Sequence, residues 1–284
     1  MLQKKIISKV RKFIEEKPSH RDLVSNVNKN SLLFFYGNNY SQAGQDGIIK
    51  EIFNRLDIKS GYFIEFGAWD GVYLSNIFNL WKNKGFNALL IEGDSYRADQ
   101  LLNSLKDYDN TEAMNCFVDP DSKGEYCLDN LLKLSEFNIT NDNLSLISMD
   151  TDGLDYEIFE SLSEYRPKVI IIETLTLQDG QDMHEDKHAK GERGNTGYII
   201  NNLKSTWNLA EKKGYKVVCH TGNAFLVRDD LVNLLPDTDF SFESIHCYES
   251  DNAIWQSLNE NGEKTENINY QTIKYQNFLN EALK

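Results

Sequence analysis

From about residue 62 to residue 174, short apolar runs alternate with stretches of helical periodicity, and this alternation limits the folds open to the chain. The runs expected as strands are Tyr62–Phe66, Ala88–Ile91, Met114–Val118, Leu144–Met149 and Val169–Thr174. Because these short runs are mainly apolar and do not alternate regularly between apolar and polar residues, they are typical of strands covered on both faces. Helical stretches between them predict a parallel sheet with right-handed crossovers, which is an α/β fold.

The pattern changes after a last long helical stretch, which is expected over Tyr198–Lys213. Two apolar runs, Tyr215–Cys219 and Ala224–Val227, are separated by only four residues, among them a Gly and an Asn. Such a gap permits a hairpin but is too short for a crossover helix. The sequence therefore predicts a mostly parallel seven-stranded sheet that ends in an antiparallel hairpin, which differs from an ordinary dinucleotide-binding fold.

Composition excludes several classes of protein. Hydrophobic residues make up 40% of the 284 residues and charged residues 26%, so the chain can bury a core. The formal charge of −14 argues against a nucleic-acid-binding protein, which would normally present a basic face. The sequence has neither an apolar run of about 20 residues nor a signal-peptide block at its start. We therefore expect no transmembrane segment. The four cysteines form no Cys-x-x-Cys pair and no dense framework, so we expect a reducing, cytoplasmic setting.

Charge and periodicity divide the chain into three parts. Residues 1–39 form a basic extension, in which Leu2, Ile6, Val10 and Phe13 recur at helical spacing. This helix would dock on the acidic body of the protein, or else contact a membrane surface or an acidic partner. Residues 40–230 carry the α/β pattern. Residues 231–284 form a helical C-terminal extension that would cap a cleft or mediate homo-oligomer formation.

The first strand runs into a turn that suits a cationic ligand. Gly67 follows the strand directly, so backbone can approach a ligand there without a side chain in the way. We expect a helix to open at this turn and to offer unpaired amides. Trp69 replaces the second Gly of a dinucleotide-binding turn, and Glu65 precedes the first. An acid here would repel a pyrophosphate but would attract the ammonium of S-adenosylmethionine.

Two further strand ends carry acids. Glu92 ends the second strand 25 residues after Gly67, close to the spacing at which nucleotide sites place a ribose-binding carboxylate. Asp119 follows the third strand and would meet the adenine amino group. Either acid alone would be interpreted as a solvated loop carboxylate. Because the acids occur together at successive strand ends, they favour a nucleoside site.

Five segments occur in an order that resembles a known family. They are Tyr40-Ser-Gln-Ala-Gly-Gln-Asp46, Phe63-Ile-Glu-Phe-Gly-Ala-Trp-Asp-Gly71 with Ser75-Asn76, Leu90-Ile-Glu-Gly-Asp94, Ser148-Met-Asp-Thr-Asp-Gly153 with Asp155-Tyr156, and Arg166-Pro-Lys-Val-Ile-Ile-Ile-Glu173. Over about residues 40–230 the chain resembles the FkbM-type S-adenosylmethionine-dependent methyltransferases. One departure concerns Ser148–Gly153, where many relatives carry Lys-Ile-Asp-x-Glu-Gly. The role of that lysine cannot be transferred to this chain.

The resemblance implies a Rossmann-like class I methyltransferase fold with helices on both faces of the sheet, in agreement with the strand pattern. It also implies methyl transfer to oxygen, often on sugars of surface polysaccharides or secondary metabolites. The acceptor would be a small-molecule sugar, a nucleotide-activated sugar or a glycan precursor. The residues assigned to the cofactor are Gln45, Glu65, Gly67, Ala68, Asp70, Gly71, Glu92 and Asp119. For Gln45 the resemblance is the only basis.

Acceptor activation is assigned to acids at the fourth and fifth strand ends. A sugar hydroxyl is a poor nucleophile, so a base or a metal ion should assist it. Asp150 ends the fourth strand and Glu173 the fifth, and these strands are neighbours in the inferred sheet. With Asp152 they would form an oxygen-rich site for Mg²⁺ or another divalent cation. Alternatively, Asp150 alone acts as general base. Asp155 reads better as a cap of the following helix.

The polar loop Gln178–Asn195 contains a formal His-Glu-x-x-His match at His184–His188. A zinc protease needs this motif inside an amphipathic helix, and the loop has almost no apolar residue. A mobile lid or an acceptor-binding loop is the better interpretation. His220, in the predicted hairpin, is a further candidate base or a structural residue.

Two other functions compete with methyl transfer. An NAD-dependent oxidoreductase shares the general fold, but Trp69 and the terminal hairpin argue against it. A non-catalytic cofactor-binding or assembly protein would keep the fold without the chemistry, and the presence of Glu65, Gly67, Glu92 and Asp150 speaks against that reading.

Overall fold

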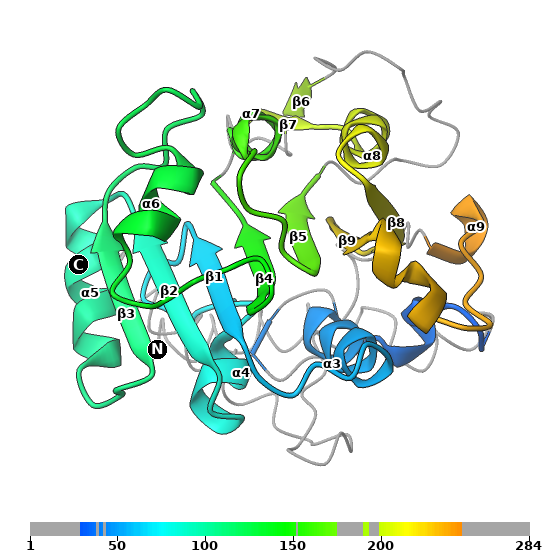
Figure 1. The fold of residues 1–284 in the computed structure, drawn as a ribbon, viewed down its shortest axis with the longest axis horizontal. Coiled ribbons are helices and arrows are strands. Elements are labelled where there is room, and N and C mark those ends of the chain that lie inside the picture. The colour runs from blue at the N-terminus through cyan, green and yellow to red at the C-terminus, as the bar shows by residue number, and fades with distance from the viewer. Residues whose placement is uncertain are drawn as a thin grey trace, which may run out of the picture.

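The computed structural model describes residues 29–37, 40–41, 44–151, 153–174, 190–192 and 199–245 (Figure 1). Side chains are described for these residues except 190–192, 199–201 and 242–243. The basic helix expected near the start, the final helix expected near Tyr275–Leu283, Asp152 and most of the loop Gln178–Asn195 lie outside the described residues.

A seven-stranded sheet runs through the centre of the molecule in the order β3-β2-β1-β4-β5-β9-β8. Its strands are β1 (Tyr62–Phe66), β2 (Asn87–Glu92), β3 (Thr111–Asn115), β4 (Leu144–Met149), β5 (Val169–Glu173), β8 (Tyr215–His220) and β9 (Asn223–Arg228). Strands β1 to β5 are parallel, whereas β9 lies antiparallel between β5 and β8. A separate pair is formed by β6 (Lys190–Glu192) and β7 (Ile199–Asn201). This strand order, with one reversed strand near an edge, is the Rossmann-like class I methyltransferase fold, as predicted.

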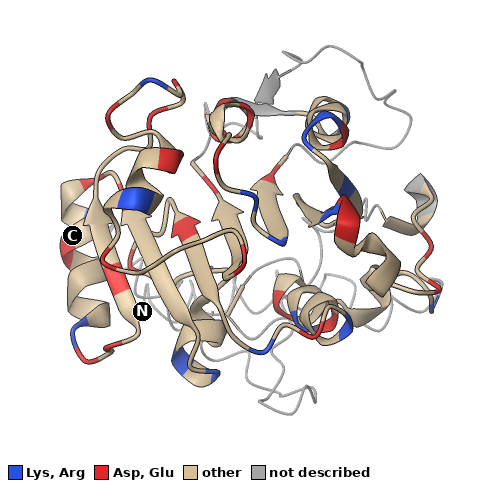
Figure 2. Ribbon diagram, in the orientation of Figure 1, with Lys and Arg blue, Asp and Glu red and all other residues tan. Residues whose placement is uncertain are grey.

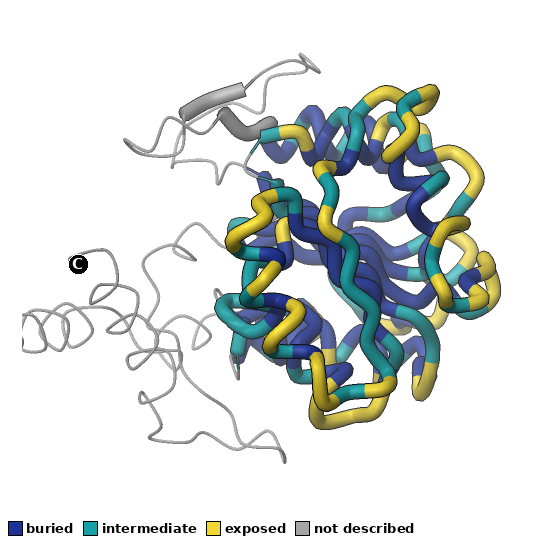
Figure 3. Tube along the Cα trace, turned by 90° about the vertical axis from the view of Figure 1, so that its left-hand side faces the viewer, coloured by how far each residue is buried: buried dark blue, intermediate teal, exposed yellow. Residues whose placement is uncertain are grey.

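Helices cover both faces of the sheet, which explains why the strands are mainly apolar instead of alternating. The helices are α3 (Gln45–Arg55), α4 (Phe78–Asn83) and α5 (Ser95–Leu105) on one face, and α6 (Leu128–Leu134), α7 (Asp155–Ser161) and α8 (Leu203–Lys212) on the other (Figure 1). Successive strand residues enter different cores: Phe63 packs with α3 and α4, whereas Ile64 packs with α6 and α7. Each such fully buried side chain stabilises the fold by roughly 1.5–3 kcal/mol. Figure 3 shows the buried strands at the centre and the exposed positions on outer loops.

The prediction that a helix begins directly after Gly67 is wrong. Residues 69–77 form turns and bends, with an isolated β-bridge between Leu74 and Ser41, and α4 begins only at Phe78. The carboxylate of Asp70 accepts hydrogen bonds from the backbone N–H groups of Val72 (2.9 Å) and Tyr73 (2.6 Å), which competes with helical pairing. The turn after β1 therefore offers no helix N-terminus to a ligand.

Two other boundaries differ from the sequence expectation. The third strand is Thr111–Asn115 rather than Met114–Val118, and it pairs with β2 from Ala88↔Thr111 to Glu92↔Asn115. The helix expected from Tyr198 begins at Leu203, after β7. Neighbouring β-branched residues favour a strand at Ile199–Asn201, and the side chain of Asn202 caps α8 by accepting from Ser205 N (2.8 Å).

The described parts of both predicted extensions pack against the α/β body. They form the 3₁₀ helices η1 (Leu32–Phe35) and η2 (Asp229–Leu234) and the short helix α9 (Phe242–Ile245). Leu32, Leu33 and Leu235 belong to the core on the α3 face. Ser31 Oγ donates to Ser244 O, which joins the segment before η1 to α9.

Candidate functional site

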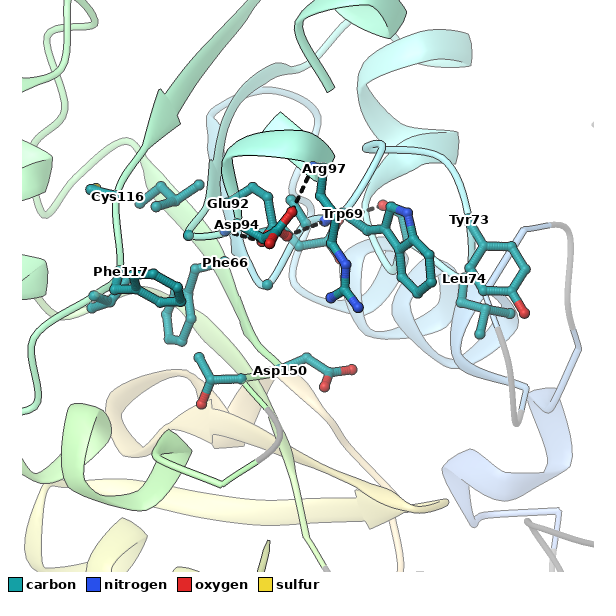
Figure 4. A pocket seen from close by; sticks show the side chains of 18 of the residues that line it. Phe66, Trp69, Tyr73, Leu74, Glu92, Asp94, Arg97, Cys116, Phe117 and Asp150 are labelled. Atoms are coloured by element: carbon teal, nitrogen blue, oxygen red, sulfur yellow. Dashed lines mark hydrogen bonds between the residues drawn. The ribbon is translucent and has the colours of Figure 1, made fainter. Parts of the chain in front are cut away.

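A pocket of about 450 Å³ opens at the carboxyl ends of β1, β2, β3 and β4. This edge of a parallel sheet is where α/β folds bind ligands, and the volume suits a nucleoside-sized molecule. Its lining comes from four places: the end of β1 and its turn, the end of β2 and the start of α5, the segment after β3, and the residues after β4. Figure 4 shows these groups around one cavity.

Glu65 lies at the inner wall of the pocket and is only 4% exposed. Its Oε2 accepts from Ser75 Oγ (2.5 Å) and its Oε1 from Asn76 N (2.8 Å). Burial raises its pKa to about 7, although these hydrogen bonds favour the ionised form and partly oppose the rise. Glu65 thus ties the end of β1 to the segment before α4, besides lining the pocket.

Asn76 was not assigned to the site from the sequence. Its Nδ2 donates to Ser148 Oγ (3.0 Å), while its Oδ1 is buried and has no hydrogen-bond partner among the described residues. Since Asn76 lines the pocket, this oxygen is an acceptor suited to a ligand N–H group.

Gly67 brings the turn after β1 against the end of β4. Its φ of +73° is in the left-handed region, and a Cβ built there would lie 1.7 Å from the carbonyl oxygen of Asp150. Only glycine fits this position. The bare backbone expected here is therefore required by packing, and it also lines the pocket together with Ala68.

Glu92 lies at the end of β2 and is 5% exposed. Its Oε2 accepts from Trp69 N (2.7 Å) and its Oε1 from Asp94 N (2.8 Å). A carboxylate offers about four acceptor positions, so two such bonds leave capacity for a ligand hydroxyl. The two amides fix the carboxylate at the pocket wall.

The segment after β3 supplies apolar lining, namely Cys116, Phe117 and Val118. The ring of Phe117 lies over Gly93, where a built Cβ would be only 2.3 Å from it, and Phe117 as a whole is 76% exposed. Asp119 is not among the residues that line the pocket. Its Oδ1 accepts from Asp121 N (2.8 Å) in a loop of its own.

Three other residues assigned to the cofactor lie outside the pocket lining. Gln45 is buried at the start of α3. Asp70 stabilises the turn described above, and Gly71, at φ +73°, packs against Leu101 of α5. The structure therefore brings Glu65, Gly67, Ala68 and Glu92 together in the lining, and Gln45, Asp70, Gly71 and Asp119 are not part of it.

Asp150 follows β4 and lines the pocket, with its carboxylate opposite Glu92 and Arg97 in Figure 4. The loop after it is held by Asp155, whose Oδ1 accepts from Thr151 N (2.8 Å) and Thr151 Oγ1 (3.0 Å). Asp155 is not the N-cap residue of α7, which is Leu154; its side chain instead turns back to the loop. Burial raises the pKa of Asp155, and the bonds from Thr151 oppose that rise.

Glu173 is the last residue of β5, and the register Met149↔Ile172 makes it the neighbour of Asp150 along the sheet edge. It is buried and is not part of the pocket lining. Beyond it, Thr174 Oγ1 and His220 Nε2 are 2.6 Å apart, both buried. Within the part of the chain that the structure describes, no group of three or more His, Cys, Asp or Glu side chains is placed to hold a metal ion.

The pocket lining also contains a cationic side chain, Arg97, that the sequence did not indicate. Arg97, in the first turn of α5, has its guanidinium carbon 4.1 Å from the centre of the Trp69 ring. An arginine on an exposed helix start gives no sequence signal for a pocket, because its reach across Trp69 depends on the turn after β1.

None of the helices in the described part of the chain combines the length and apolar character that a membrane crossing requires. No protein-family model matches the sequence, and no curated protein matches it.

Several solved structures are similar to this chain at low identity. They include a SAM-dependent methyltransferase from Aquifex aeolicus (11% identity, TM-score 0.37, covering 62% of this chain and 87% of that one). An O-methyltransferase family protein from Burkholderia thailandensis has 11% identity and TM-score 0.37, covering 65% of this chain and 58% of that one. The N-terminal domain of EvdMO1, solved with SAH and D-fucose, has 11% identity and TM-score 0.38, covering 64% and 80%. Similarity at this level does not establish a shared activity.

Proposed function

We propose that the protein is an S-adenosylmethionine-dependent O-methyltransferase. The acceptor is a hydroxyl of a sugar, a nucleotide-activated sugar or a glycan precursor. The observation that carries the proposal is the convergence of Glu65, Gly67, Glu92 and Asp150 on one pocket at the carboxyl ends of β1, β2 and β4. A pocket with four acids in its lining favours a cationic ligand over a pyrophosphate.

The lining fits the parts of that cofactor. The carboxylate of Glu92 keeps acceptor capacity for the two ribose hydroxyls. Phe117 and Val118 offer an apolar surface for adenine. At the inner wall, the orphan Oδ1 of Asn76 and the buried Glu65 suit an ammonium group. When bound, S-adenosylmethionine supplies a methyl group on an electrophilic sulfonium.

The residues of the chain then have to orient the acceptor and remove the proton of its hydroxyl group. Asp150 would accept a hydrogen bond from the acceptor hydroxyl and take its proton as the oxygen attacks. Asp155 holds the loop next to Asp150 through its bonds to Thr151, which fixes the backbone from which the Asp150 side chain extends. Alignment of this kind is worth several kcal/mol of the barrier. A divalent cation held by Asp150 and Glu173 would be a second route to the same activation, although Glu173 does not line the pocket and the described residues form no cluster of three acids around the pair.

The experiment compares cofactor binding and turnover. Calorimetry should show that the wild-type protein binds S-adenosylhomocysteine and not NAD. Asp150→Asn should abolish release of S-adenosylhomocysteine with a panel of sugar nucleotides, while its affinity for S-adenosylhomocysteine stays nearly unchanged. Asp142→Asn, an exposed acid before the opposite end of β4, is the matched control and should keep full activity.

Assays with EDTA and with added Mg²⁺ separate the two routes of activation. Loss of turnover in EDTA that Mg²⁺ restores would favour the metal route over the direct one. Full activity in Asp150→Asn would remove the role of Asp150, and binding of NAD in place of S-adenosylhomocysteine would overturn the proposed function.

A further inference from the structure

Arg97 is the one basic side chain among the described residues that line the pocket. It projects from α5 across the face of Trp69 into the cavity (Figure 4). Within the described part of the chain, its guanidinium forms no ion pair with any carboxylate, although Glu92 and Asp94 belong to the same lining.

The ring under Arg97 is held in place from several sides. Trp69 N donates to Glu92 Oε2 (2.7 Å), and the indole Nε1 donates to Gln100 Oε1 (3.1 Å). Tyr73 packs edge-on against the ring at 5.5 Å. The backbone of Trp69 has a φ of +49°, a conformation that costs a bulky residue energy and that the surrounding bonds maintain. The stack therefore orients the guanidinium before any ligand binds.

The chemistry of this group selects an anion. A guanidinium presents its N–H donors in a planar fork that matches a carboxylate or a phosphate, and stacking on an aromatic ring leaves the edge of that fork available. The amino-acid end of S-adenosylmethionine carries two charges, an ammonium and a carboxylate. Acceptors for the ammonium lie at the inner wall, in Asn76 Oδ1 and Glu65. The lining offers the carboxylate one cation, which is Arg97.

We propose that Arg97, held on Trp69, binds the carboxylate of the amino-acid part of the cofactor and so makes the pocket specific for the complete zwitterion. This inference rests on the proposed function, because it needs the cofactor to occupy this pocket. It adds a specificity-determining residue that the fold and the sequence motifs do not assign. A phosphate on the acceptor is the other anion that Arg97 could take, and the experiment separates the two.

The test is a calorimetric cycle with two ligands that differ in this carboxylate alone, S-adenosylmethionine and decarboxylated S-adenosylmethionine. The wild-type protein should bind the complete molecule more tightly, because a hydrogen-bonded charge pair is involved. Arg97→Gln should weaken binding of S-adenosylmethionine by on the order of tenfold and leave binding of the decarboxylated ligand unchanged. Arg97→Lys keeps the charge without the planar fork and should lose part of the preference.

Lys106→Gln removes one positive charge from the exposed end of the same helix and should leave both affinities as in the wild type. Thermal unfolding of each variant checks that the fold is intact. An equal loss for both ligands in Arg97→Gln would overturn the inference, as would unchanged affinity for both. If Arg97→Gln raised only the KM for a phosphorylated acceptor, the inference would be overturned, and Arg97 would instead bind the phosphate of the acceptor. If the wild-type protein binds neither ligand, the proposed function itself fails.

Discussion

At the residue scale, Glu65 combines burial with a place in the pocket wall, and this has a consequence for stability. Its pKa rises from 4.5 to about 7 on folding, mainly because burial disfavours the charged form. Between these values the folded protein keeps a proton that the unfolded chain releases. The contribution of Glu65 to stability is therefore complete below about pH 4.5 and is lost as the pH rises to about 7.

Glu65→Gln removes this titration while keeping a carbonyl oxygen that can accept from Asn76 N. The free energy of unfolding of the wild-type protein should fall more steeply from pH 5 to pH 7.5 than that of the variant. Urea unfolding at pH 5, 6 and 7.5 measures both, and the other buried acids, including Asp155, contribute equally to the two curves. Parallel curves would show that Glu65 does not carry this dependence.

Two glycines with nearly the same φ allow the conformational cost of a Gly→Ala substitution to be measured separately from the cost of a steric clash. Gly67 and Gly85 have φ values of +73° and +70°, but a Cβ at Gly67 meets the carbonyl of Asp150 at 1.7 Å, whereas one at Gly85 meets nothing within 4 Å. Gly85→Ala should cost about 1 kcal/mol, which reflects the positive φ alone. Gly67→Ala should cost about 2–4 kcal/mol, because overpacking adds to that. Urea unfolding measures both, and similar losses would contradict the packing role of Gly67.

At the element scale, the sequence predicted the buried strands well and the turns poorly. The run Leu144–Met149 is buried throughout, so its mainly apolar composition, without regular alternation, reflects cover on both faces. The segment after Gly67 failed as a helix, because side chains of Glu65 and Asp70 take its N–H groups. Those bonds depend on the turn geometry rather than on periodicity.

The site follows the same division. Glu92 and Asp150 could be assigned because each directly follows an apolar run in the sequence, and strand ends share one edge of a parallel sheet. Arg97 and Asn76 could not, because their position in the pocket depends on the path of the turn between β1 and α4. Asp119 was assigned from a third strand placed too late, and the true strand ends at Asn115.

A buried aspartate joins α6 to the loop before β5. The carboxylate of Asp129 accepts from Ser163 N (2.8 Å), Ser163 Oγ (2.9 Å) and Glu164 N (3.1 Å). Asp129→Asn replaces one acceptor oxygen by a donor, so one set of these bonds is lost. It should lower the free energy of unfolding by about 1–3 kcal/mol. The exposed Asp142→Asn should change it by less than about 0.5 kcal/mol, and an equal effect of the two would contradict this role.

At the scale of the whole molecule, the strands of the sheet differ in burial: the central strands β4 and β5 are fully buried, whereas the edge strand β3, which leads into part of the pocket lining, is less covered. Figure 2 shows acidic positions at the tips of several strands, where the ligand edge lies. Strand β4 is buried along its whole length between β1 and β5. The two edge strands differ: β3 is half-buried, whereas β8 is mostly buried and is contacted by η1, η2 and α9. Local stability should follow this order.

Hydrogen–deuterium exchange read by mass spectrometry tests both the order and the site. Amides of β4 should exchange slowest, and those of β3 faster than those of β8, since β3 has fewer covering contacts. S-adenosylhomocysteine should then slow exchange in the segments 65–69, 73–76, 91–94 and 116–118, which line the pocket, because ligand binding stabilises the closed state of what it touches. Strands β8 and β9 supply no lining residue and should be unaffected. Protection confined to that hairpin would place the ligand elsewhere, whereas protection of segment 116–118 together with the ends of β1 and β2 would support binding in this pocket.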